Sequence, residues 1–153
     1  MDPIRRILVA VDFSPHSRVA LDYAATLADA FGATVEVLHV WEPPLMEPPG
    51  PIVAEAQVTL WEMLQRNAET ALAEFVAQAS ERGVRVSSSR ALVGSPARAI
   101  LDEAERSGAN LIVVGSHGRT GLSRALLGSV AERVVRHAHC PVLCVRSPLS
   151  KPS

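Results

Sequence analysis

Residues 111–129 read LIVVGSHGRTGLSRALLGS, and this stretch decides the fold. Its first four residues are all apolar, which is typical of a parallel strand that is covered on both faces. A glycine-rich irregular loop follows from residue 115 to residue 127, and Ser129 then begins an apolar helical repeat. A buried strand, a loop and a helix in this order are the repeating unit of an α/β protein.

The same unit recurs on both sides of this stretch. Short apolar runs predict further strands at residues 7–11, 34–40, 84–92 and 142–145. Ser14-Pro15 and Ser95-Pro96 begin helices, because serine is a good N-cap and proline suits the first helical position. Glycines at positions 32, 83 and 108 end helices. Each of the four predicted helices has an apolar inner face. In chain order, these faces consist of Ala20, Ala24, Leu27 and Phe31; Leu60, Leu64, Ala68, Ala71, Phe75 and Ala79; Ala97, Ile100, Leu101 and Ala104; and Ala131, Val134, Val135 and Ala138.

The alternation of strands and helices predicts the topology of the sheet. Since each connection carries a helix, the five strands are expected to be parallel, with helices on both faces. The third strand is the most polar and belongs at an edge, which suits the open strand order 3-2-1-4-5. Ligands of such sheets bind outside the carboxyl ends of the strands where the order reverses. Here these ends are Val11-Asp12 and Val114-Gly115.

Composition limits the class of protein. The 153 residues fit a single domain, which we place at residues 1–147, with a proline-rich loop at 42–51 and a flexible tail at 148–153. The 15 basic and 16 acidic residues nearly balance, which argues against nucleic-acid or anionic-membrane surfaces. No apolar run approaches the roughly 20 residues of a membrane span, and no signal peptide precedes the first strand. We therefore expect a cytoplasmic protein.

The glycines after residue 114 follow the spacing Gly115-x2-Gly118-x9-Gly128-Ser129. This pattern is not a P-loop, since GxxxxGK[ST] occurs nowhere in the chain. Glycines nevertheless allow a backbone to approach an anion closely, and a helix that starts near Gly128 offers free N–H groups to phosphate. The spacing predicts a site for a polyphosphate between the two glycine clusters.

Residues 110–146, together with the opening ILVAVDFS at 7–14, resemble the universal stress proteins over nearly the whole chain. The glycine spacing is similar to that of the family's ATP-binding type. The resemblance implies the nucleotide-binding α/β fold of flavodoxin-like and Rossmann-like proteins, with ATP and Mg²⁺ as ligands. It also implies phosphate or ribose contacts from the glycine motif, a place for Asp12 near the ribose or the metal, and adenine near the backbone of Val40. The expected nucleotide-binding residues are Ala10, Val11, Asp12, Val40, Gly115, Ser116, His117, Gly118, Arg119, Gly128, Ser129 and Val130.

Several of these residues have a purely structural alternative. Ser129 and Glu132 are spaced as a capping box, in which the serine hydroxyl bonds the helix backbone instead of phosphate. Asp12 is alternatively a solvated carboxylate at the start of the following helix. Arg119 and Arg124 either pair with phosphate or are solvated, and His117 either contacts phosphate or is simply exposed.

Other side chains are weaker candidates for a site. His137, His139 and Cys140 match no zinc spacing, and no base is evident that would activate Cys140 as a nucleophile. We expect Cys140 and Cys144 to be reduced and buried. Trp61 and Met63 either form a partner surface or cover the sheet, and the sequence leaves both possibilities open.

These features leave three classes of function. The first is an ATP-binding stress-response regulator that contacts a further protein partner. The resemblance implies that this protein is a homodimer, and the edge of strand 142–145 offers a place for the two chains to pair. In this class ATP acts as a conformational signal that orders residues 118–127, with slow or no hydrolysis, because Asp12 is the one carboxylate that we place near the phosphates. The alternatives are a nucleotide-free dimeric interaction module and an enzyme that turns over a nucleotide.

Overall fold

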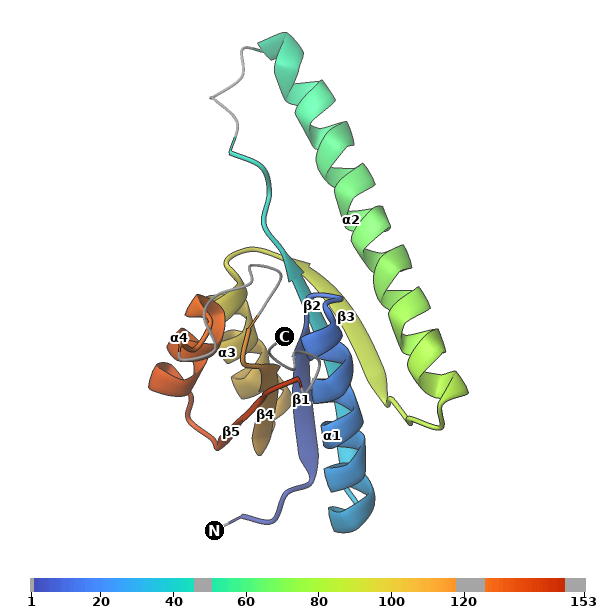
Figure 1. The fold of residues 1–153 in the computed structure, drawn as a ribbon. Helices are drawn as coiled ribbons and strands as arrows, with labels where there is room; N and C mark the ends of the chain where they lie inside the picture. The colour runs from blue at the N-terminus through green and yellow to red at the C-terminus, as the bar shows by residue number, and fades with distance from the viewer. Residues whose placement is uncertain (1, 46–50, 118–125, 148–153) are drawn as a thin grey trace, which may run out of the picture.

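The computed structural model describes residues 2–45, 51–117 and 126–147, and the side chains from residue 54 onward in the second of these ranges. Its strands and helices alternate along the chain as β1 (Arg6–Val11), α1 (Pro15–Phe31), β2 (Thr34–Trp41), α2 (Pro51–Glu81), β3 (Ser88–Val93), α3 (Pro96–Ser107), β4 (Leu111–Gly115), α4 (Ser129–His137) and β5 (Val142–Val145). The strands form one parallel sheet in the order β3-β2-β1-β4-β5 (Figure 1). The predicted fold class and strand order are therefore confirmed.

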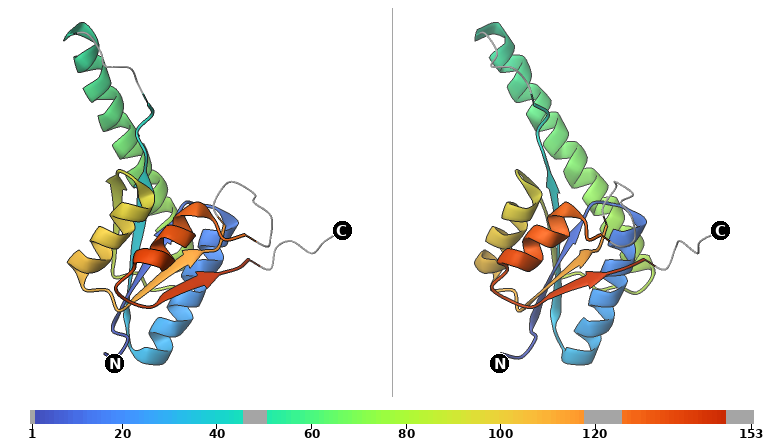
Figure 2. Two further views of the ribbon diagram at one scale, coloured as in Figure 1. Left: turned by 90° about the vertical axis from the view of Figure 1, so that its left-hand side faces the viewer. Right: turned by 60° about the vertical axis from the view of Figure 1, so that its left-hand side comes forward.

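The sheet separates two apolar cores. Ile7, Val9 and Val11 of β1 pack with α1 and α2, whereas Leu8 and Ala10 of the same strand pack with α3 and α4. This division follows from the alternation of side chains along a strand. Figure 2 shows α3 and α4 next to each other on their face of the sheet, where the two helices contact each other.

Strand β3 begins later than the sequence predicts. Residues 84–87 are not part of it, although Val84 is buried and Val86 packs against the core of α1 and α2. Ser87 donates from both its backbone N–H and its hydroxyl to the carbonyl oxygen of Val35, at 2.8 and 2.7 Å, and regular pairing with β2 starts one residue later. The apolar residues that suggested a strand thus serve the turn between α2 and β3. The position of β3 at the sheet edge is as predicted.

Helix α2 extends well beyond the sheet at its N-terminal end (Figure 1). Pro51 is its first residue rather than the last of the loop, which suits a proline without an N–H donor. The predicted inner stripe is buried at Ala68, Phe75 and Ala79 but only partly buried at Leu60, Leu64 and Ala71. Trp61 and Met63 are 42% and 55% exposed, so neither is part of the buried core.

Two residues of the predicted inner faces are exposed. Phe31 is 55% exposed because it falls in the last turn of α1, one residue before the left-handed Gly32. Val135 is 48% exposed because the short helix α4 buries the stripe of Ala131 and Val134, and the next position is turned about 100° away. Among the described residues, no helix is long and apolar enough to cross a membrane.

Candidate functional site

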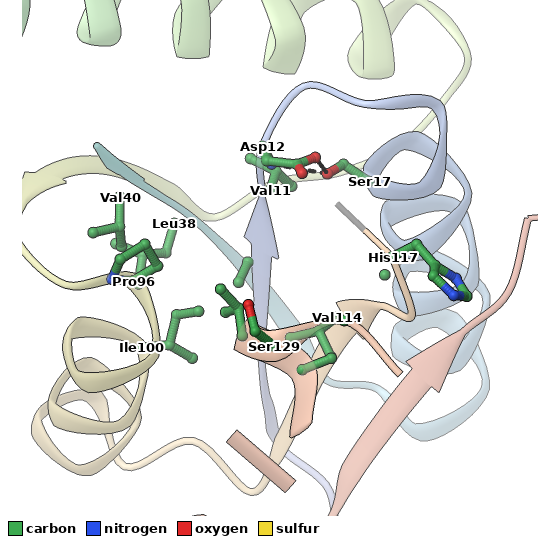
Figure 3. Close-up of a pocket in the computed structure, with 15 residues that line it drawn as sticks. Val11, Asp12, Ser17, Leu38, Val40, Pro96, Ile100, Val114, His117 and Ser129 are labelled. Carbon is green, nitrogen blue, oxygen red and sulfur yellow. Dashed lines mark hydrogen bonds between the residues drawn. The ribbon is translucent and has the colours of Figure 1, made fainter. Parts of the chain in front are cut away.

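A pocket of about 260 Å³ lies at the carboxyl ends of the strands, on the face that α3 and α4 cover. Its apolar wall comes from three strands, α3 and α4, and Figure 3 shows Leu38, Val40, Pro96 and Ile100 together on one side of it. The position follows from topology, because β1 and β4 are neighbours whose following connections leave the sheet on opposite faces. The lining residues are Ala10, Val11, Asp12, Ser17, Leu38, Val40, Pro96, Ile100, Val114, Gly115, His117, Gly128, Ser129, Val130 and Ala131.

Asp12 gives the pocket its carboxylate and also organises the start of α1. Its Oδ1 accepts hydrogen bonds from the backbone N–H of Ser14 at 3.0 Å and from the hydroxyl of Ser17 at 2.6 Å. The hydroxyl of Ser17 in turn accepts from the backbone N–H of Asp12 at 2.8 Å. The sequence left two alternatives for Asp12, the start of the helix and the ligand pocket, and Asp12 lies at both. Ser17 holds the Asp12 side chain in a defined orientation (Figure 3).

The start of α4 forms the opposite side of the pocket. Gly128 is the N-cap residue and Ser129 is the first residue of the helix, with no side-chain hydrogen bond at the cap. The N–H of Glu132 bonds the carbonyl oxygen of Gly128 at 2.9 Å. The capping-box alternative is therefore wrong, because the helix begins at Ser129 itself, one residue too early for the Ser129 hydroxyl to cap it. Ser129 is exposed and lines the pocket, next to the N-terminal end of a helix dipole.

Gly115 ends β4 where the chain passes close to α1. A Cβ atom at this position would lie 3.0 Å from Cβ of His16 and 3.4 Å from the carbonyl oxygen of His117. The rings of these two histidines are 5.8 Å apart, and His117 is buried rather than exposed, with its Nδ1 3.0 Å from the hydroxyl of Ser116. The close approach of the backbone to α1 thus favours glycine at this position.

Gly115→Ala is expected to lower the free energy of unfolding by about 1 kcal/mol, since an added methyl group must displace His16. Urea unfolding followed by circular dichroism measures the change. An unchanged midpoint would contradict the expectation and would mean that His16 moves aside without cost.

The structure brings most of the predicted nucleotide-binding residues together. The pocket contains Ala10, Val11, Asp12, Val40, Gly115, His117, Gly128, Ser129 and Val130. Ser116 lies outside its lining and is buried, with its backbone N–H bonded to the carbonyl oxygen of Val145 at 2.8 Å. Gly118 and Arg119, like Arg124, lie outside the described residues.

Six lining residues were not predicted as site residues: Ser17, Leu38, Pro96, Ile100, Val114 and Ala131. Ile100 and Ala131 were recognised only as inward-facing. The signal Ser95-Pro96 could have placed the start of α3 at the pocket, because a helix that follows β3 begins at the carboxyl edge of the sheet.

The histidines and cysteines near the C-terminus lie elsewhere. His139 pairs with Glu105 at 2.8 Å, and the described residues contain no group of three or more metal-ligating side chains. Cys140 and Cys144 are free thiols that are partly, not fully, buried. Burial raises the pKa of both thiols, so each is less ionised than an ordinary cysteine and is a poor nucleophile.

The family model of the universal stress protein family matches residues 3–146. A universal stress protein of Methanocaldococcus jannaschii is 39% identical over 145 residues, which cover 94% of this chain and 83% of that protein. The solved structure of the hypothetical protein MJ0577 has a TM-score of 0.79 at 30% identity, over 97% of this chain and 100% of that chain.

Two further solved structures are nucleotide complexes. One is a universal stress protein in complex with cAMP, with a TM-score of 0.68 and 25% identity over 94% of this chain and 98% of that chain. The other is a universal stress protein from Archaeoglobus fulgidus in complex with dAMP, with a TM-score of 0.57 and 27% identity over the same shares. The family model and the curated relative each extend over nearly all of this sequence. The chain therefore belongs to the universal stress protein family.

Proposed function

We propose that this protein binds ATP in the pocket between β1, β4 and the start of α4, and that the bound nucleotide acts as a conformational signal. The observation that carries the proposal is one pocket in which an apolar slot faces a helix N-terminus without a side-chain cap. A purine base suits the slot formed by Leu38, Val40 and Ile100, and phosphate suits the free N–H groups at the helix start. The cAMP and dAMP complexes of two relatives support an adenine nucleotide as the ligand.

Mg²⁺ fits the charges of this pocket. Among the described lining residues there is no lysine or arginine, and Asp12 contributes a negative charge. A polyphosphate beside this carboxylate needs a cation, and Mg²⁺ commonly binds through one or two carboxylates together with substrate phosphates. Asp12 is the residue that we assign to the ion or its water shell, where the ion would screen the phosphates from the carboxylate.

We further propose slow or no hydrolysis. Asp12 is the one carboxylate among the described lining residues, and its Oδ1 already accepts two hydrogen bonds. A carboxylate held in this way is poorly placed to orient an attacking water as a general base.

Three further expectations stay predictions from the sequence. They are the ordering of residues 118–127 by ATP, a cytoplasmic location and the predicted domain limits.

A homodimer that pairs through β5 is part of the proposal. Strand β5 pairs only with β4 among the described residues, so its other edge is open to a second chain. Its residues Val142, Leu143 and Cys144 are only partly buried.

The test is the nucleotide content of the purified protein. Denaturation followed by chromatography identifies any adenine nucleotide that is released, and calorimetric titration of the stripped protein with MgATP measures affinity. Bound adenine nucleotide and saturable ATP binding are the expected results. A protein that is purified empty and does not bind ATP would favour the nucleotide-free interaction module, and steady release of ADP or AMP would favour an enzyme.

Ser129→Ala separates ligand contact from helix capping. Because the Ser129 hydroxyl does not cap α4, the substitution is expected to change the free energy of unfolding by less than about 0.5 kcal/mol. We expect it to weaken ATP binding by roughly fivefold, the equivalent of about 1 kcal/mol for a lost hydrogen bond. Ser80→Ala, at an exposed position of α2, is the control. A loss of stability without a loss of affinity would contradict this assignment.

A further inference from the structure

Phe13 has a backbone conformation that a residue with a side chain rarely adopts. Its φ is 65°, and within residues 2–45, 51–117 and 126–147 no other non-glycine residue has a positive φ. In this left-handed region Cβ comes too close to a backbone carbonyl oxygen, so the conformation persists only where the surroundings hold it. Such a residue next to a binding pocket requires a structural explanation.

Two aromatic side chains hold the ring of Phe13. The ring lies 4.2 Å from that of His39 and 5.6 Å from that of Phe75, measured between ring centroids. His39 is buried on β2, and its Nδ1 is 2.8 Å from the carbonyl oxygen of Val11. A carbonyl oxygen can only accept, so Nδ1 donates in this bond and ties His39 to the end of β1. Phe75 is a buried residue of α2.

Phe13 and its neighbour Asp12 serve opposite sides of the sheet. Phe13 packs against the core of α1 and α2, whereas Asp12 lines the pocket on the side of α3 and α4. The left-handed turn at Phe13 separates the two side chains in this way. It also brings the N–H of Ser14 to Oδ1 of Asp12, at 3.0 Å.

We propose that Phe13 is a positioning residue for the nucleotide pocket. Its contacts with His39 and Phe75 hold the turn that presents Asp12 to the pocket, and they connect this turn to α2. Movement of α2 at Phe75 therefore changes the position of Asp12, and a ligand on Asp12 changes the packing of α2. The part that concerns nucleotide rests on the proposed function, whereas the positioning of Asp12 does not.

Two substitutions of Phe13 distinguish the backbone conformation from the ring. Phe13→Ala removes the ring but keeps the penalty of a left-handed Cβ, so the turn is expected to open and ATP affinity to fall roughly tenfold, or about 1.4 kcal/mol. Phe13→Gly also removes the ring, but glycine adopts the turn without penalty, and we expect a loss of only about threefold. Phe31→Ala, at an exposed phenylalanine of α1, is the matched control and leaves affinity unchanged.

A double substitution tests the connection to α2. Phe75→Leu keeps an apolar side chain in the core but removes the ring contact with Phe13, and it is expected to weaken ATP binding about threefold. If the two rings act as one unit, Phe13→Gly combined with Phe75→Leu loses no more affinity than Phe13→Gly alone. Additive losses would overturn the connection.

Amide hydrogen exchange of Ser14 and Ser17 without nucleotide makes the positioning test independent of ATP. The N–H of Ser14 donates to Asp12 Oδ1, and the N–H of Ser17 donates to Ser14 Oγ. The exchange rates of these two groups therefore report whether the turn is closed. Phe13→Ala should speed their exchange about tenfold, more than Phe13→Gly, in proteins shown to be folded by circular dichroism.

The outcomes distinguish the two proposals. Exchange in Phe13→Ala that equals that of Phe31→Ala overturns the positioning role, whether or not ATP binds. Faster exchange with unchanged affinity, in a wild-type protein that binds ATP, overturns the connection between turn and pocket. Faster exchange in a protein that does not bind ATP supports the positioning of Asp12 and overturns the proposed function instead.

Discussion

Gly128→Val is expected to abolish ATP binding and to leave the fold intact. Gly128 is buried, lines the pocket and is the N-cap residue of α4, so an isopropyl group at this position enters the space that we assign to phosphate. Valine is also a poorer N-cap than glycine, but that difference amounts to only about 1 kcal/mol. We expect the ATP dissociation constant to rise at least a hundredfold, which corresponds to about 2.7 kcal/mol.

Calorimetric titration with MgATP measures this effect, and far-ultraviolet circular dichroism checks that the sheet and helices remain. Ala30→Val adds the same side chain at an exposed position of α1 and serves as the matched control. Gly118→Val is expected to behave like Gly128→Val on the sequence argument alone, since residue 118 lies outside the described residues. Wild-type affinity in both glycine variants would show that the glycine motif does not bind phosphate.

Glu103→Ala is expected to have the largest effect on stability among the substitutions proposed for this protein. The Glu103 side chain is 5% exposed and lies between Arg90 of β3 and Arg106 of the last turn of α3. Its carboxylate accepts two hydrogen bonds from Arg90, at 2.9 and 3.0 Å, and further ones from Arg106. The contact holds α3, which carries Pro96 and Ile100 of the pocket, against the edge of the sheet.

Loss of this carboxylate should lower the free energy of unfolding by about 2 kcal/mol. The value lies below that for a fully buried pair because both arginines are partly exposed and regain water. Thermal and urea unfolding measure the change. Glu132→Ala is the matched control, because its ion pair with Arg136 is exposed and contributes no more than about 0.5 kcal/mol. Equal stability of Glu103→Ala and wild type would show that α3 is held by its apolar face alone.

The same cluster predicts how stability depends on pH. Hydrogen bonds from Arg106 and Arg90, together with their positive charges, hold the pKa of Glu103 below its ordinary value of 4.5, against the opposing effect of burial. The contribution of Glu103 is therefore complete above about pH 4.5 and is lost as the pH falls through the lowered pKa. The stability difference between wild type and Glu103→Gln should shrink over this range, and a difference that is constant down to pH 3 would contradict the assignment.

The sequence predicted the elements and their arrangement because the signals for them are local. Four consecutive apolar residues at 111–114 indicate a buried strand, and serine-proline pairs indicate helix starts, whatever the rest of the chain does. The reversal of strand order then located the pocket at Val11-Asp12 and Val114-Gly115, where the structure has it. Predictions of this kind depend on neighbours in the chain and on general rules of connection.

The errors lie where a local signal allows two outcomes. Ser129 and Glu132 satisfy the spacing of a capping box, but the helix starts one residue earlier than that motif requires. Val84 and Val86 are as apolar as strand residues, yet they pack in a turn. Phe31 and Val135 follow the helical repeat, but about half of each residue is exposed. In each case the outcome depends on the exact boundary of a helix or strand, or on whether a residue from a distant part of the sequence packs against the side chain.

The sequence by itself thus determined the fold class, the strand order and the edge of the sheet at which a ligand would bind. Only the tertiary structure decided which side chains come into contact. These contacts are the hydrogen bond of Ser17 with Asp12, the packing of Pro96 and Ile100 beside Val40, the three rings of Phe13, His39 and Phe75, and Glu103 between its two arginines. Most of these contacts join residues that are far apart in the chain. Local propensity and periodicity carry no information about such pairs, because the contacts exist only once the strands have assembled and the helices have packed on them.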